Sequence, residues 1–158
     1  MGCLLSEVFD TRSIKLDLDG KTKEMAFIEL IESIAVLNPE CDCRDIIEAI
    51  KKREEKMNTG ICSGVAIHRA YCRGIGNMAG AIGVSKEGID YGAPDSKPVH
   101  VIFLLALSEN VKENHLHVLN QIFNLAHSEA FPLIKSAKNA QDIHSILSRT
   151  YQGGRSTI

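Results

Sequence analysis

The segment from Val99 to Leu107 constrains the fold most, because it is apolar apart from His100 and has the length of a single β-strand. A strand that is apolar at nearly every position is typical of a sheet covered on both faces. An amphipathic helical pattern, from about Glu113 to Ala126, follows it directly. The chain is therefore predicted to contain a central sheet with helices packed against it.

Hydrophobic periodicity and turn residues predict further elements on either side of this strand. Helices are expected at residues 21–37, from the capping residue Asp42 to Met57, and at residues 129–137 and 140–151, and strands at residues 13–18, 65–68, 79–84 and 98–107. Helices thus both precede and follow the strands. This order favours an α/β fold, a three-layer α/β/α sandwich in which helices flank a mixed sheet.

The 158-residue chain is expected to form one domain over residues 1–152, with a flexible tail at residues 153–158. Lys plus Arg number 18 and Asp plus Glu number 20, and the resulting net charge of −2 excludes a dedicated nucleic-acid binder. No apolar run is long enough to span a bilayer, so membrane insertion is not expected. Five cysteines without a C-x-x-C pair indicate reduced thiols and a cytoplasmic location.

His115 lies near the start of the helical pattern that follows the apolar strand. When successive residues are placed about 100° apart, Ile122 and Ala126 lie within about 20° of His115, whereas His117 lies on the opposite side. His115 is thus expected to head the buried face. The positive end of the helix dipole disfavours imidazolium, and a neutral imidazole offers one lone pair and one N–H. Such a side chain suits a nucleophile, a general base or a partner for a phosphoryl group, and equally a core histidine bonded to a backbone carbonyl.

His68 and Arg69 lie at the end of the predicted strand 65–68. If this strand and the strand 98–107 are parallel neighbours, their carboxyl ends lie at one edge of the sheet, where ligands bind in open α/β folds. His68, Arg69 and His115 would then meet at that edge. No cysteine or histidine pair has a familiar zinc-ligand spacing, and no complete phosphate-binding loop is present. Neither a metal ion nor a cofactor is therefore expected.

Four segments match a known family in order and spacing. They are TGICSGVAI at 59–67, GIDY at 88–91, DSKPV at 95–99 and ENHL at 113–116. With these segments the chain resembles the enzyme IIA domain of the fructose–mannitol class in the bacterial phosphotransferase system, and most closely the nitrogen-regulatory enzyme IIA. The resemblance covers most of the chain.

The resemblance implies a three-layer α/β/α fold and a place in a phosphoryl relay. The family's active histidine takes a phosphoryl group from a phosphorylated HPr-type carrier and passes it to a sugar-transporter domain. In the nitrogen branch, the phosphorylation state instead regulates partner proteins. A second histidine of the family, matched here by His115, supports the phosphohistidine.

The chain departs from the family at the centre of its motif, where the family reads A-I-P-H-A-R-x-P-G and this chain reads AIHRAYCRG at residues 66–74. A match without gaps keeps Ala70 and Gly74 in register and places Arg69 at the position of the phosphorylated histidine. A match with a gap makes His68 the acceptor. Because successive strand residues point to opposite faces, His68 points away from the family's site unless the backbone is locally shifted.

Three hypotheses of function follow from these observations. The first is a regulatory phosphoryl carrier in which His68 accepts the phosphoryl group from an HPr-type protein, His115 supports it and Arg69 neutralises its charge. The second is an enzyme IIA-fold regulator that is not phosphorylated and acts by binding a partner protein, because a guanidinium has no free lone pair but binds phosphate or carboxylate. The third is a structural interaction module in which His115 is an ordinary core histidine.

Overall fold

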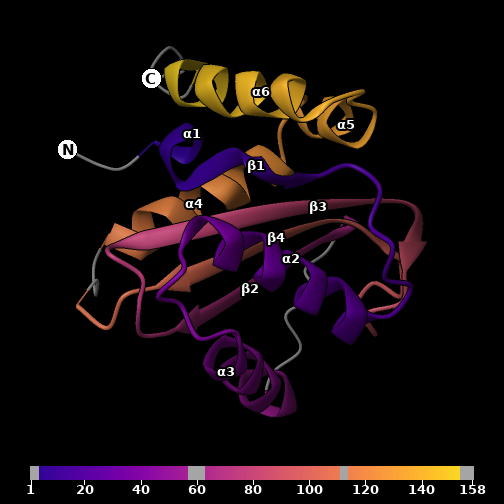
Figure 1. Cartoon of the computed structure of the whole chain (residues 1–158). Helices are drawn as coiled ribbons and strands as arrows, with labels where there is room; N and C mark the ends of the chain where they lie inside the picture. Colours follow the sequence, from indigo (N-terminus) through magenta and orange to yellow (C-terminus); the bar gives the residue numbers. More distant parts are fainter. Residues whose placement is uncertain (1–3, 57–62, 111–113, 154–158) are drawn as a thin grey trace.

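A mixed four-stranded sheet with the strand order β1-β3-β4-β2 forms the centre of the molecule (Figure 1). The computed structural model describes residues 4–56, 63–110 and 114–153. The strands are β1 (Phe9–Lys15), β2 (Val65–Tyr71), β3 (Met78–Ile89) and β4 (Val99–Leu107). β1 pairs parallel to β3 and β2 pairs parallel to β4, whereas β3 and β4 are antiparallel. β1 and β2 are therefore the two edges of the sheet.

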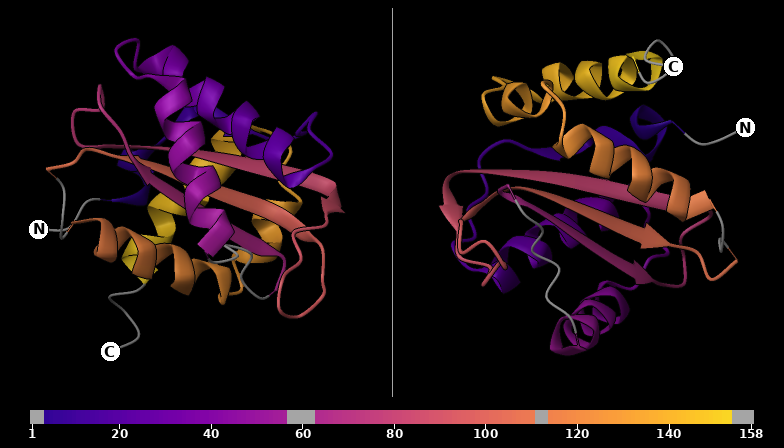
Figure 2. Two further views of the ribbon diagram at one scale, coloured as in Figure 1. Left: turned by 90° about the horizontal axis from the view of Figure 1, so that it is seen from below. Right: turned by 180° about the vertical axis from the view of Figure 1, so that it is seen from behind.

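Helices cover both faces of this sheet (Figure 2). One face carries α2 (Lys23–Leu37) and α3 (Cys43–Lys56). The other face carries α1 (Leu5–Val8), α4 (Asn114–Ala126), α5 (Phe131–Lys135) and α6 (Ala140–Gly153). The predicted three-layer α/β/α arrangement with a mixed sheet is confirmed. None of the described helices is long and apolar enough to cross a membrane.

β4 contributes side chains to both hydrophobic cores, as the apolar run predicted. Phe103 and Leu105 pack into the core beneath α4 and α6, and Ile102 and Leu104 pack into the core beneath α2 and α3. All four are fully buried. Burial of this kind contributes roughly 1.5–3 kcal/mol per large apolar side chain, so β4 is a main source of the stability of the fold.

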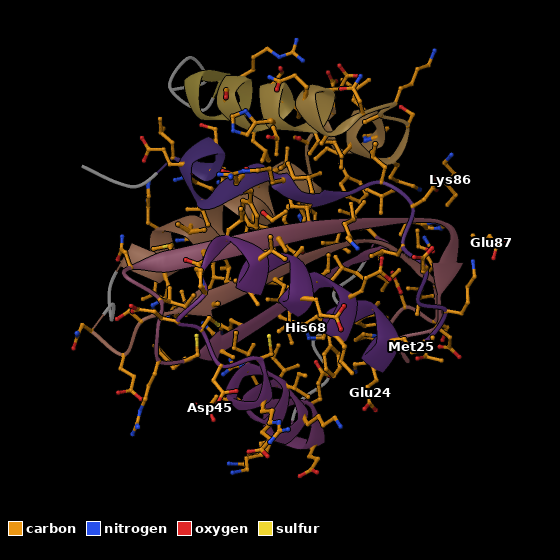
Figure 3. All side chains as sticks on the ribbon, viewed as in Figure 1. Glu24, Met25, Asp45, His68, Lys86 and Glu87 are labelled. Atoms are coloured by element: carbon orange, nitrogen blue, oxygen red, sulfur yellow. The ribbon has the colours of Figure 1, made fainter. Side chains whose placement is uncertain are left out.

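Several element boundaries differ from the prediction, and strand pairing explains the largest differences. β1 begins at Phe9 rather than at residue 13, because the Phe9 ring packs over Gly80 of the neighbouring β3. β3 continues past residue 84 to Ile89, which pairs with Val99 after a register shift. Lys86 and Glu87 project from this end of the sheet (Figure 3). Because both residues are charged, this part of β3 lacks the apolar pattern that predicts a strand.

The helices follow the predicted ones more closely. α2 begins one residue after Thr22, whose hydroxyl accepts a hydrogen bond from the Met25 N–H at 3.2 Å, as is typical of an N-cap. Asp42 likewise accepts a hydrogen bond from the Arg44 N–H at 2.9 Å at the start of α3. α5 is shorter than the predicted helix at 129–137. α6 extends to Gly153, and the rest of the predicted tail, residues 154–158, lies outside the described residues.

Candidate functional site

β2 and β4 are parallel neighbours, as the predicted site requires, and their register fixes where the motif residues point. His68 is opposite Leu104 and Arg69 is opposite Leu105. Leu104 belongs to the core beneath α2 and α3, whereas Leu105 belongs to the core beneath α4. Because successive strand residues point to opposite faces, His68 and Arg69 lie on different sides of the sheet.

His68 lies in the middle of β2 and is fully buried between the sheet and α2 (Figure 3). Its Nε2 is 2.9 Å from the hydroxyl of Tyr91, and its Nδ1 is 3.4 Å from Oε1 of Glu54 on α3. Since a carboxylate can only accept, Nδ1 carries the proton and donates it to Glu54. The Nε2 lone pair of neutral His68 then accepts the hydrogen bond from Tyr91.

Lys23 and the burial of the two rings hold His68 and Tyr91 in this network. Lys23 of α2 pairs with Glu54, and its ammonium lies 5.2 Å from the centre of the Tyr91 ring. Burial lowers the pKa of His68, although Glu54 opposes this shift, and burial also raises the pKa of Tyr91. His68 is therefore a neutral imidazole that ties β2 to α3 and to the loop of Tyr91. It is not a side chain presented to solvent.

His115 lies on the other side of the sheet, in the first turn of α4. It is 7% exposed, and its ring makes an edge contact with the ring of Tyr71, with the ring centres 6.1 Å apart. Val118 and Ile122 are fully buried, and His117 faces solvent. The predicted buried face of this helix is thus confirmed.

Arg69 is half-buried and projects to the same side of β2 as Tyr71. Its pKa is lowered by burial and by the nearby guanidinium of Arg53 on α3. Among the residues that the structure describes, neither arginine takes part in an ion pair. The positive charge of Arg53 thus acts on Arg69 at this edge strand, and a guanidinium of this kind can bind a carboxylate or phosphate.

Exposed apolar side chains occur on the same two elements, β2 and α4, as Arg69 and His115. Tyr71 is 45% exposed, and on α4 Leu116 is 54% and Phe123 is 48% exposed. Leu116 and Phe123 are seven residues apart and so lie on one side of the helix. We refer to the surface of Arg69, Tyr71, His115, Leu116 and Phe123 as the docking face.

Two of the three predicted site residues thus lie on the same side of the sheet. Arg69 is on β2, two residues from Tyr71, and the ring of Tyr71 contacts the ring of His115. The expectation that His68 joins them at one edge is wrong, because the alternation of β2 turns His68 to the opposite face, where it contacts Phe27 of α2 and Glu54 of α3. The sequence analysis missed Tyr71 as a neighbour of His115. It also missed Tyr91, Glu54 and Lys23, whose contacts with His68 and with one another depend on how the helices fold over the sheet.

The fold and this edge of the sheet define an α/β protein of the enzyme IIA class. Residues 7–150 match the model of the family described as phosphoenolpyruvate-dependent sugar phosphotransferase system, EIIA 2. The chain belongs to this family, whose general role is to carry phosphoryl groups in the phosphotransferase system.

Two relatives illustrate the range of the family. The chain is 33% identical over 121 residues to the fructose-specific EIIABC component of Bacillus subtilis, covering 77% of this chain and 19% of that protein. It therefore spans only a small part of that multidomain relative. It is 28% identical over 150 residues to the fructose-specific EIIA component of Haloferax volcanii, covering 94% of this chain and 97% of that one.

Solved structures agree with this assignment. The nitrogen regulatory protein IIA-Ntr of Neisseria meningitidis superposes with a TM-score of 0.82 at 27% identity, covering 90% of this chain and 98% of that one. The mannitol enzyme IIA of Escherichia coli, solved in complex with phosphorylated enzyme IIB, superposes with a TM-score of 0.70 at 16% identity, covering 89% of this chain and 99% of that one. The second likeness shows the shared fold alone.

Proposed function

We propose that this chain is a regulatory protein of the phosphotransferase system that binds a partner protein through the docking face and does not itself carry a phosphoryl group. The observation that carries this proposal is the position of the two motif residues. His68, the only imidazole of the motif, is fully buried on the far side of the sheet, and the motif residue on the docking face is Arg69.

The chemistry of Arg69 supports binding without transfer. A nucleophile needs a lone pair, which a guanidinium does not offer because it stays protonated. Its planar set of N–H donors does bind a phosphoryl group or a carboxylate in a bidentate manner. An arginine on the docking face would therefore hold an anionic group of the partner in place.

The exposed side chains of the docking face support a protein as the partner. Arginine, tyrosine and phenylalanine are enriched in protein–protein interfaces, and arginine and tyrosine are frequent among the residues that dominate binding energy. A mannitol enzyme IIA forms a complex with phosphorylated enzyme IIB. We infer that the partner here is a cytoplasmic protein of the same system, either an HPr-type phosphocarrier, a transporter domain or a regulated protein.

The second candidate function is a phosphoryl carrier with His68 as the acceptor, with His115 and Arg69 assisting. The general role of the family favours it. For this reaction Nε2 of His68 would have to give up its hydrogen bond with Tyr91, and the His68 ring would have to leave the core. The structure therefore supports this candidate less well than the first.

We expect no acid-labile phosphate on the native chain after incubation with phosphoenolpyruvate, enzyme I and an HPr-type carrier. In contrast, the substitution Arg69→His should create labelling, because it places an imidazole on the docking face while leaving the His68 network intact. The measurement is radioactive phosphate incorporation, with a standard enzyme IIA as the positive control.

Arg69→Gln is the matched control, because it removes the guanidinium without supplying a nucleophile and should remain unlabelled. Labelling of the native chain that disappears in His68→Gln would establish the carrier instead. A folded Arg69→His variant that takes no label would show that the docking face lacks the geometry of a transfer site, and would count against the proposal.

A further inference from the structure

A groove lies at the opposite end of the sheet from the docking face. β2 and β4 begin at this end, and their arrowheads in Figure 1 point away from it. An open groove of about 590 Å³ lies between the starts of these strands and α5. The seven residues of β2 place it roughly 20 Å from Tyr71, because a strand rises about 3.3 Å per residue. The groove is therefore independent of the role of Arg69.

The walls of the groove are held by specific backbone contacts. The carboxylate of Asp95 accepts hydrogen bonds from the Ser63 N–H at 2.9 Å and from the Lys97 N–H at 3.0 Å. These two bonds lower the pKa of Asp95 and engage both of its oxygens. The carbonyl of Gly64 accepts hydrogen bonds from the N–H groups of His100 and Val101, at 2.8 and 3.1 Å. These hydrogen bonds connect the segment at Ser63 and Gly64 to the segment from Asp95 to Val101.

The side chains along the groove favour an anion. Lys97, His100 and Lys135 are among the described residues that line it, and none of those residues carries a carboxylate. The adjacent carboxylate of Asp95 is already hydrogen-bonded to the N–H groups of Ser63 and Lys97. Nδ1 of His100 is 2.9 Å from the carbonyl of Ser85 and must donate, because a carbonyl only accepts. The orientation of this ring is therefore fixed. The two lysine side chains are flexible, so their ammonium groups can both reach a bound phosphate.

Apolar groups complete the groove. Pro98, Phe131 and Pro132 line it together with the two lysines. Small-molecule sites typically have volumes of about 300–1,000 Å³ and combine apolar walls with a few polar groups. A bare phosphate ion would leave these apolar walls unused, whereas a phosphate attached to a small organic group would use both kinds of surface.

We propose that this groove binds a small organic phosphate monoester, with Lys97 and Lys135 holding the phosphate and Pro98, Phe131 and Pro132 packing against the organic group. The groove would make the chain responsive to a phosphorylated metabolite at a site remote from its partner-binding face. This proposal holds whether or not the chain is itself phosphorylated.

Binding can be tested by titration of the full chain, followed through the backbone amide signals in NMR. The probes are phenyl phosphate, inorganic phosphate and phenol. We expect phenyl phosphate to bind about tenfold more tightly than inorganic phosphate and phenol not to bind, with shifts at Gly64, His100 and Phe131. No saturable shift with phenyl phosphate, or equal affinity for phenyl phosphate and inorganic phosphate, would overturn the proposal.

Substitutions of single lysines test whether phenyl phosphate binds in the groove. Lys97→Gln and Lys135→Gln should each weaken phenyl phosphate binding about tenfold, because each removes one charged contact to the phosphate. Lys51→Gln, which removes an exposed lysine of α3 on the other face of the sheet, should leave the affinity unchanged. Equal weakening in all three variants, or shifts confined to Arg69 and Tyr71, would contradict binding in the groove. The latter result would leave the proposed function intact.

Discussion

Replacing His68 with alanine is expected to lower the free energy of unfolding by about 3–5 kcal/mol. The change leaves a cavity beside Phe27 and Tyr91 and removes the imidazole that partners both Tyr91 and the buried carboxylate of Glu54. Large-to-small changes in a core and the loss of one partner of a buried polar pair each cost several kcal/mol. Chemical denaturation with an unchanged m-value measures this effect.

The matched control is His117→Ala, because His117 is exposed on α4 and should change the stability by less than about 0.5 kcal/mol. A pH series adds a second check. Burial lowers the pKa of His68 in the folded state, so native stability should decline as the pH falls below about 6.5, and this part of the decline should be absent in His68→Ala. A small loss of stability in His68→Ala would mean that the ring is accessible, as an acceptor must be.

Replacing Gly74 with alanine is expected to destabilise the fold by about 3 kcal/mol. Gly74 has a φ of +85°, a conformation that costs an L-residue roughly 1–2 kcal/mol. A Cβ there would also overlap the backbone carbonyl of Glu40 in the loop between α2 and α3, and overpacking of this kind costs about 1–3 kcal/mol. Thermal or denaturant unfolding of the purified variant measures the combined loss in the free energy of unfolding.

Gly76→Ala provides the control for this experiment, because a Cβ at Gly76 meets nothing within 4 Å and its φ is not in the left-handed region. It should be nearly neutral. Gly74 is also the residue that keeps the motif in register with the family when no gap is introduced. A neutral Gly74→Ala would mean that the loop after β2 adopts another path, and would contradict the close approach of Gly74 to Glu40.

The layer arrangement was predictable from the sequence because β4 and the long helices carry strong local signals. The apolar run at 99–107 and the periodic pattern after Glu113 fixed one strand and one helix almost to the residue. The late half of β3 gave no such signal. Its polar residues Lys86 and Glu87 are in the strand only because Ile89 pairs with Val99 on β4.

The site was predictable only in part, for a geometric reason. The alternation of a strand predicts that His68 and Arg69 face opposite sides, and the helical pattern predicts that His115 heads a buried face. Which side of the sheet each helix covers does not follow from local pattern. The contacts of Tyr71 with His115 and of Glu54 with His68 therefore appear only in the folded chain.

The most direct test of the central claim follows the phosphoryl group and the contact surface in one sample. The isotope-labelled chain is mixed with a phosphorylated HPr-type carrier, and ³¹P and amide spectra are recorded together. Our account predicts that the phosphohistidine signal stays on the carrier while the amide signals of Arg69, Tyr71, Leu116 and Phe123 shift. A ³¹P signal that moves to this chain, with changes centred on His68 and Tyr91, would contradict it.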